Sequence, residues 1–123
     1  MFSSKKNLSY KDNITFNERK NESMRIREKY PDRIPCIVEL SNRLNDIKLD
    51  KNKYLVPNDL TCGQLLYIIR KRVKIGAEKA LFMYVSKKVL PPSSSLLSQI
   101  YSEHKDEDGF LYLRVESENT FGA

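Results

Sequence analysis

The strongest constraint on the fold is a well-capped amphipathic helix in the middle of the chain, with strand-like runs on both sides. Thr61 and Gln64 have the spacing of a capping box, which satisfies free amide groups at a helix start. Apolar residues then recur at helical spacing, at Leu65, Leu66, Ile68, Ile69 and Val73. Such a helix must bury its apolar stripe, so we expect a sheet beneath it.

Four segments have the β-branched and aromatic content of strands, namely residues 33–40, 51–57, 80–85 and 110–115. The first two are separated by a modest loop, so we expect them to pair as an antiparallel hairpin. The third is apolar throughout, which predicts a central strand covered on both faces. A second, short helix is expected around residues 96–101, where apolar residues again recur at helical spacing.

The first 31 residues are predicted to form a helical extension ahead of a domain that spans residues 32–123. A second capping box, Thr15 with Glu18, begins a helix that Tyr30-Pro31 ends, because a residue before proline avoids helical angles. Residues 1–13 fit either a mobile segment or a short helix. The remaining order, ββαβαβ, is that of a ubiquitin-like β-grasp, and the fold class is α+β with added N-terminal helices.

The second predicted strand, Lys51–Pro57, has features of a sheet edge. Alternation sends Tyr54 and Val56 to one face and Lys53 and Leu55 to the other. Pro57 lacks an amide hydrogen, so it either ends the strand or confines it to an edge. A basic edge strand of this kind can leave main-chain groups open to a partner chain.

Charge and cysteine content narrow the function classes without choosing among them. The chain has 22 Lys and Arg against 16 Asp and Glu, a formal charge of +6, which suits acidic peptides, anionic lipid or nucleic acid. No apolar run is long enough for a membrane span, and the start lacks a secretory pattern. Cys36 and Cys62 have no CxxC spacing and a single His accompanies them, so we expect no metal or other cofactor, reduced buried thiols and a cytoplasmic location.

Two other function classes find little support in the residues. An enzyme would need a nucleophile with a base or paired carboxylates, whereas His104 is expected at the surface and the cysteines lack a partner, so we expect no catalytic activity. The run Arg70–Arg72 permits nonspecific phosphate contacts, but no helix-turn-helix, RNA-recognition or zinc signature accompanies it, so no specific nucleic acid is expected.

Several sequence words occur together in an order that resembles a known family. They are REKYPDRIP at residues 27–35, DKNKYLVPNDLT at 50–61, IRKR at 69–72, AEKALFMYV at 77–85, LPPSS at 90–94 and KDEDGFLYL at 105–113. From about Phe16 to Gly122 the chain is similar to the autophagy-related ubiquitin-like modifiers. This family includes the gamma-aminobutyric-acid-receptor-associated proteins and the microtubule-associated light chains.

The resemblance implies covalent attachment to membranes. Family members are attached through a C-terminal glycine to phosphatidylethanolamine on autophagosomal membranes, so the protein would be cytoplasmic and, when lipidated, bound to autophagosomes or vesicles. The matching glycine is Gly122, which a single Ala123 follows. The implied partners are a cysteine protease that removes Ala123 and the activating and conjugating enzymes of the pathway.

The resemblance also implies recognition of short peptides with an aromatic residue, two spacers and an aliphatic residue, carried by cargo receptors and adaptors. Such a peptide would add itself as a strand beside residues 51–57. The implied first pocket consists of Glu22, Ile26, Pro35, Lys53, Leu55 and Phe110. The implied second pocket consists of Tyr54, Val56, Pro57, Leu60, Leu65 and Ile68. Arg33, Lys51, Lys53 and Arg72 would meet acidic residues that flank the motif.

Burial is expected to differ among these positions. Val56, Leu60 and Ile68 would be core residues in any β-grasp domain, whereas Tyr54 beside an edge proline is expected to be partly exposed. The chain also departs from the family at Leu65, where an aromatic residue is frequent, which implies a second pocket of different shape. A ubiquitin-like adaptor in vesicle trafficking that binds peptides without being conjugated is the nearest alternative function.

Overall fold

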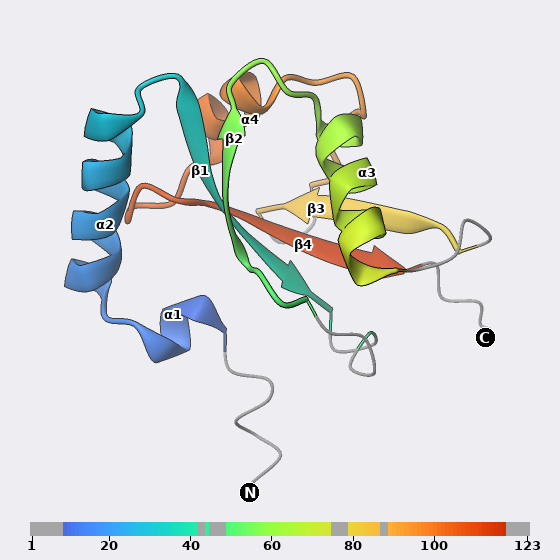
Figure 1. The fold of residues 1–123 in the computed structure, drawn as a ribbon, viewed down its shortest axis with the longest axis horizontal. Coiled ribbons are helices and arrows are strands. Elements are labelled where there is room, and N and C mark those ends of the chain that lie inside the picture. Colours follow the sequence, from blue (N-terminus) through green and yellow to red (C-terminus); the bar gives the residue numbers. More distant parts are fainter. Residues whose placement is uncertain (1–8, 42–43, 45–48, 75–78, 87–88, 118–123) are drawn as a thin grey trace, which may run out of the picture.

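The described part of the chain contains four helices and four strands in the order ααββαβαβ (Figure 1). The computed structural model describes residues 9–41, 44, 49–74, 79–86 and 89–117. The elements are α1 (Tyr10–Asn13), α2 (Phe16–Lys29), β1 (Arg33–Leu40), β2 (Lys53–Pro57), α3 (Cys62–Val73), β3 (Leu81–Val85), α4 (Leu97–His104) and β4 (Leu111–Ser117).

The strands form one mixed sheet in the order β2-β1-β4-β3, which confirms the α+β fold class. β1 pairs antiparallel with β2, with Cys36 opposite Tyr54, so the predicted hairpin is confirmed. On its other side β1 pairs parallel with β4, with Cys36 beside Leu111. Among the described strands, β2 has a neighbour on one side only. This agrees with the prediction that a strand containing Pro57 lies at an edge of the sheet or ends at the proline.

The prediction of a central strand at residues 80–85 is wrong. β3 lies at the second edge of the sheet, where β4 is its neighbour among the described strands. Its burial alternates, with Leu81, Met83 and Val85 buried and Phe82 and Tyr84 half-buried. The apolar run therefore reflects one covered face together with aromatic residues on a face that stays partly open.

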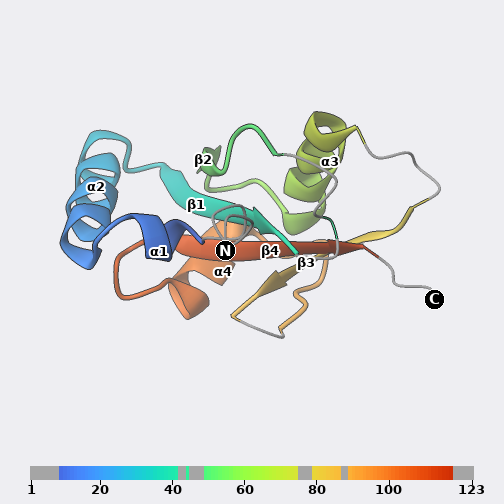
Figure 2. The same cartoon turned by 90° about the horizontal axis from the view of Figure 1, so that it is seen from below.

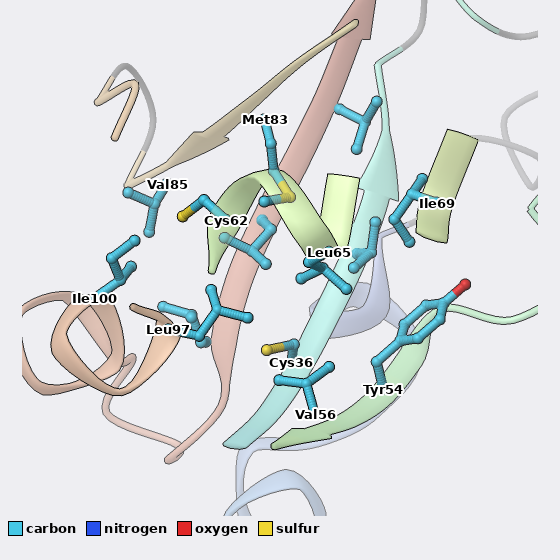
Figure 3. Packing of buried hydrophobic residues seen from close by; sticks show 14 of the residues in the cluster. Cys36, Tyr54, Val56, Cys62, Leu65, Ile69, Met83, Val85, Leu97 and Ile100 are labelled. Carbon is cyan, nitrogen blue, oxygen red and sulfur yellow. The ribbon is translucent and has the colours of Figure 1, made fainter. Parts of the chain in front are cut away.

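The main core lies between one face of the sheet and helices α3 and α4. Alternation in β1 sends Ile34, Cys36 and Val38 to this face, where they are nearly or fully buried. In Figure 3, Leu65 and Ile69 of α3 and Leu97 and Ile100 of α4 extend into the same layer. Other members of the cluster include Tyr54, Val56, Cys62, Met83 and Val85.

The opposite face of the sheet is covered at one end by α1 and α2, which lie away from α3 in both views (Figures 1 and 2). Ile37 faces this side because it alternates with Cys36 and Val38, and it clusters with Tyr10 and Phe110. The side chain of Glu39 accepts a hydrogen bond of 2.7 Å from the amide of Tyr10, which holds α1 to β1. The division at residue 31 into extension and domain remains a prediction.

Local signals in the sequence account for the helix starts. Thr15 with Glu18 and Thr61 with Gln64 both form reciprocal capping boxes, as predicted. A third capping box, Ser9 with Asp12, begins α1, so within residues 1–13 the described part is a short helix. α3 ends at Lys74, whose φ of 59° is left-handed, and the predicted exit at Gly76 lies outside the described residues.

A buried ion pair joins α2 to the turn before β4. The Nε of Arg19 lies 2.8 Å from the Asp108 carboxylate, and the two side chains are 9% and 0% exposed. The same carboxylate accepts hydrogen bonds from the Tyr112 hydroxyl and the Phe110 amide. The acidic turn before β4 is therefore partly an internal anchor, because Asp108 is buried and holds Arg19.

Replacing Asp108 should destabilise the protein strongly. Asp108→Asn keeps the shape of the side chain but leaves the Arg19 guanidinium buried without its counter-charge, which costs about 3–5 kcal/mol. Equilibrium unfolding in urea measures this loss. Glu116→Gln, which removes a carboxylate from the exposed pair with Arg114, should cost less than about 1 kcal/mol. Equal losses in both variants would show that the buried pair has no special role.

Candidate functional site

The open edge of β2 offers main-chain groups to another strand. The amide of Val38 donates to the carbonyl of Asn52 at 2.8 Å, which identifies this as a hydrogen-bonded pair of the β1–β2 ladder. In an antiparallel ladder, hydrogen-bonded pairs alternate with pairs that share no hydrogen bond. Lys53 and Leu55 belong to the pairs without a hydrogen bond. Their N–H and C=O groups point away from β1, toward the side where the sheet ends.

Pro35 and Pro57 both occupy positions of the β1–β2 ladder at which no N–H is needed for a hydrogen bond between these two strands. Pro35 stands opposite Leu55, and Pro57 stands opposite Arg33. At both positions the missing N–H would have pointed away from the partner strand, so neither proline weakens the β1–β2 ladder. β2 thus stays paired with β1 along its whole length, while none of the described strands pairs with its other side.

The residues assigned to the first pocket lie together on the α2 side of the sheet. Glu22 and Ile26 come from α2, Lys53 and Leu55 from β2, and all four are half-buried. Pro35 and Phe110 are buried and form the layer beneath them. The structure therefore brings this set into one region, with four side chains near the surface and two in the interior.

An ion pair between Lys53 and Glu22 links β2 to α2 in this region. Burial alone would raise the pKa of Glu22, but the hydrogen bond from Lys53 and its charge outweigh burial and hold the pKa below its usual value. The Tyr10 hydroxyl donates to the other carboxylate oxygen at 3.1 Å, and burial raises the pKa of that hydroxyl. Glu22 is therefore ionised and held by α1 as well as by β2.

Tyr10 is a residue of this region that the sequence reasoning missed. It is 7% exposed, and its ring lies edge-on to Phe110 with 5.7 Å between centroids. The Lys53 ammonium lies 5.7 Å from the centroid of the same ring. The capping box formed by Ser9 and Asp12 could have revealed a helix here and with it an ordered Tyr10.

The second set of residues divides between the core and the surface. Tyr54, Val56 and Leu65 are buried, and Figure 3 shows them facing one another between β2 and α3. The expected exposure of Tyr54 is wrong, since it is only 6% exposed because its ring faces α3 rather than the edge. Ile68 is 41% exposed, so its expected place in the core is wrong too. Pro57 is exposed and Leu60 half-buried, so these two and Ile68 line the accessible part.

The cations expected to meet acidic residues already have partners in the described structure. Arg72 lies 2.9 Å from the exposed carboxylate of Asp50. The Lys51 ammonium lies 5.0 Å from the centroid of the Tyr54 ring. Arg33 donates through Nη1 to the main-chain carbonyl of Leu55 at 3.1 Å. The Tyr54 hydroxyl is buried without a hydrogen-bond partner among the described residues, although the charge of Arg72 acts on it.

Comparison with known proteins identifies the family. The family model described as "Autophagy protein Atg8 ubiquitin like" matches residues 18–122. The chain is 56% identical over 114 residues to autophagy-related protein 8 of Schizosaccharomyces pombe, covering 93% of each chain. It is 57% identical over 115 residues to autophagy-related protein 8a of Arabidopsis thaliana, covering 94% of this chain and 93% of the relative. The chain belongs to the Atg8 family.

A solved Atg8 supports the same assignment in three dimensions. The crystal structure of Trypanosoma brucei ATG8 superposes with a TM-score of 0.83 at 46% identity, covering 94% of this chain and 98% of that one. The ubiquitin-like fold and an autophagy role follow from this membership. Gly122 falls within the span that the family model matches, but it lies outside the described residues.

The two cysteines of this Atg8-family chain are buried and free, as predicted. Burial raises the pKa of the Cys62 thiol to about 11 and raises that of Cys36 further above its usual value. Both thiols are therefore protonated at neutral pH and poor nucleophiles. The described residues contain no cluster of His, Cys, Asp and Glu that could hold a metal ion. They also contain no helix long and apolar enough to cross a membrane.

Removing Lys53 should raise the pKa of Glu22. In Lys53→Met the carboxylate keeps the burial that raises its pKa and loses the cation that lowers it, so its titration moves upward. An NMR titration of the Glu22 side-chain carboxyl carbon measures the change. Lys29→Met, on the exposed end of α2, serves as the control and should leave Glu22 unchanged.

The same substitution should alter the pH dependence of stability. Because the folded pKa of Glu22 lies below its ordinary value of 4.5, ionised Glu22 stabilises the wild type above that pH. This contribution is lost as the pH falls through the folded pKa. Urea unfolding at pH 7 and in the acid range should therefore show a smaller acid-induced loss in Lys53→Met. An unchanged loss would mean that the ion pair does not stabilise the fold.

Proposed function

We propose that this chain is a ubiquitin-like modifier that acts in autophagosome formation and recruits cargo receptors and adaptors through short linear motifs. In this proposal Gly122 is conjugated to phosphatidylethanolamine once Ala123 has been removed. The protein is then cytoplasmic before conjugation and bound to autophagosomal or vesicle membranes afterwards. Membership of the Atg8 family supports the autophagy role, and the β2 edge supports peptide binding.

The observation that carries the peptide-binding proposal is the unpaired side of β2 between two apolar regions. A peptide strand can pair there with the outward N–H and C=O groups of Lys53 and Leu55. Its alternate side chains would then reach the region around Ile26 and Leu55 on one side and the region around Leu60 and Ile68 on the other. In an extended peptide, an aromatic residue and an aliphatic residue separated by two spacers point to opposite faces of the strand. The spacing of the motif therefore suits two regions that lie on opposite faces of β2.

Charge favours an acidic partner for this site. The chain carries a formal charge of +6, and Arg33, Lys51 and Arg72 all lie near β2 and the adjoining α3. Cations at the rim of a site speed the encounter with acidic peptides and add modest affinity. Peptides with Asp or Glu beside the motif are therefore the partners that this surface suits best.

Conjugation requires two reactions in sequence, hydrolysis of the bond after Gly122 and then formation of an amide bond to the lipid. The family's processing protease hydrolyses the Gly122–Ala123 peptide bond and frees the Gly122 carboxylate. The activating enzyme uses ATP to convert this carboxylate into an acyl adenylate with release of pyrophosphate, and the acyl group passes through enzyme thioesters to the amine of phosphatidylethanolamine, so that an amide forms and AMP and the enzyme thiol are the leaving groups. Glycine suits this step because a terminus without a side chain can enter a narrow catalytic cleft.

Truncating the accessible apolar residues should weaken peptide binding. Leu55→Ala and Ile68→Ala each remove an apolar contact, which should raise the Kd for an aromatic-x-x-aliphatic peptide about 5- to 30-fold. Isothermal titration calorimetry measures the Kd. Tyr67→Ala is the matched control, because Tyr67 is 59% exposed on the same helix one residue before Ile68. A peptide that binds all four proteins equally would show that the site lies elsewhere.

Conjugation should depend on Gly122 and not on the peptide site. With the protease, activating enzyme, conjugating enzyme, ATP and phosphatidylethanolamine liposomes, wild type should be lipidated and Gly122→Ala should not. Deletion of Ala123 should make the protease unnecessary. Leu55→Ala should still be lipidated, measured by a gel shift and mass spectrometry. A wild-type chain that binds peptides without ever being lipidated would instead support the unconjugated adaptor.

A further inference from the structure

The side chain of Arg33 reaches across β2 to its open side. Arg33 belongs to β1 and stands opposite Pro57, yet its Nη1 donates to the carbonyl oxygen of Leu55 at 3.1 Å. That carbonyl points away from β1, because Leu55 belongs to a pair of the ladder without a hydrogen bond. The guanidinium therefore occupies an acceptor on the edge that no strand of the sheet uses.

The acceptor taken by Arg33 is one that an added strand needs. A strand that joined β2 would donate its own N–H to the Leu55 carbonyl, at the distance where Nη1 now lies. The added strand therefore competes with the guanidinium for the lone pairs of this carbonyl oxygen, and displacing the guanidinium frees the acceptor for the new ladder. Until then the contact also protects the edge from pairing with another chain.

We propose that Arg33 is an internal cap on the β2 edge, displaced by an incoming peptide, which makes binding depend on an acidic residue that receives the released guanidinium. This inference rests on the peptide-binding function proposed above and adds how that site selects its ligands. A peptide with a carboxylate after the motif replaces the lost contact. A neutral peptide must break the contact without a replacement.

The surroundings of Arg33 suit a side chain that exchanges partners while its backbone stays in place. Its amide donates to the carbonyl of Tyr30 at 3.0 Å, and its carbonyl accepts from Arg27 at 2.7 Å. The side chain itself is exposed, and no carboxylate pairs with it among the described residues. A hydrogen bond between two charged groups is stronger than one from a guanidinium to a neutral carbonyl. A carboxylate from the ligand is therefore the better partner.

Two peptides that differ in one feature test the cap. Both contain the aromatic-x-x-aliphatic motif, followed by three Glu in one and three Gln in the other, and are otherwise uncharged. Wild type should prefer the Glu peptide. Arg33→Met should bind the Gln peptide about 3- to 10-fold more tightly than wild type does, because one hydrogen bond no longer has to be broken. Its preference for the Glu peptide should shrink.

Lys79→Gln is the matched control, because it removes one exposed positive charge just before β3, at the other edge of the sheet. It should leave the affinity for the Gln peptide, and the ratio of the affinities for the two peptides, close to wild type. Without peptide, the Leu55 carbonyl carbon should move upfield in the NMR spectrum of Arg33→Met and stay in place in Lys79→Gln. The same spectra show that each variant is folded.

The outcomes separate this inference from the proposed function. If Arg33→Met binds the Gln peptide no more tightly than wild type, or if the Leu55 carbonyl carbon does not shift, the cap is wrong while peptide binding stands. If Lys79→Gln gains as much as Arg33→Met, the effect is general charge and the cap is again wrong. If wild type binds neither peptide, the peptide-binding function itself fails.

Discussion

The position of β1 between β2 and β4 is the constraint on which the rest of this structure depends. β1 uses one side for an antiparallel partner and the other for a parallel one, and β2 then stands at the end of the order, with β1 as its neighbour among the described strands. The parallel β1–β4 pair also brings the end of the described chain beside its beginning, where Asp108 meets Arg19. The open edge and the anchoring of α2 over it therefore follow from one strand order.

The alternation of side chains in β2 divides the candidate site into two unlike halves. Tyr54 and Val56 face the core and are held by α3, so on that side only residues such as Leu60 and Ile68 are within reach of a ligand. Lys53 and Leu55 face α2, where the Glu22 carboxylate accepts from Tyr10 as well as Lys53. One half is an apolar surface on a packed core, and the other is an apolar surface bordered by a fixed ion pair.

Much of this arrangement could be read from local sequence signals, and the errors share one physical cause. The capping boxes at Thr15 and Thr61 and the alternation in β2 depend on near neighbours, so they were predicted correctly. The edge position of residues 80–85, which was predicted wrongly, and the burial of Asp108, which was not predicted, both depend on partners far along the chain. Composition shows acid or apolar character at such positions, but it does not show which distant residue lies opposite. The pocket assignments came from the family resemblance and remain proposals.

Not every cation near β2 is equally available to an acidic peptide, because some of them already pair with carboxylates of this chain. Lys53 and Arg72 each hold a carboxylate, so an acidic ligand that took either one would draw the cation away from Glu22 or Asp50. Among the described residues, Arg33 contacts a neutral carbonyl and Lys51 the face of an aromatic ring. Because giving up a neutral partner costs less than giving up a charged one, acid recognition at this edge should rest mainly on Arg33 and Lys51. In the proposed function, the net charge would then set how fast acidic peptides arrive, while these two residues would decide which of them stay bound.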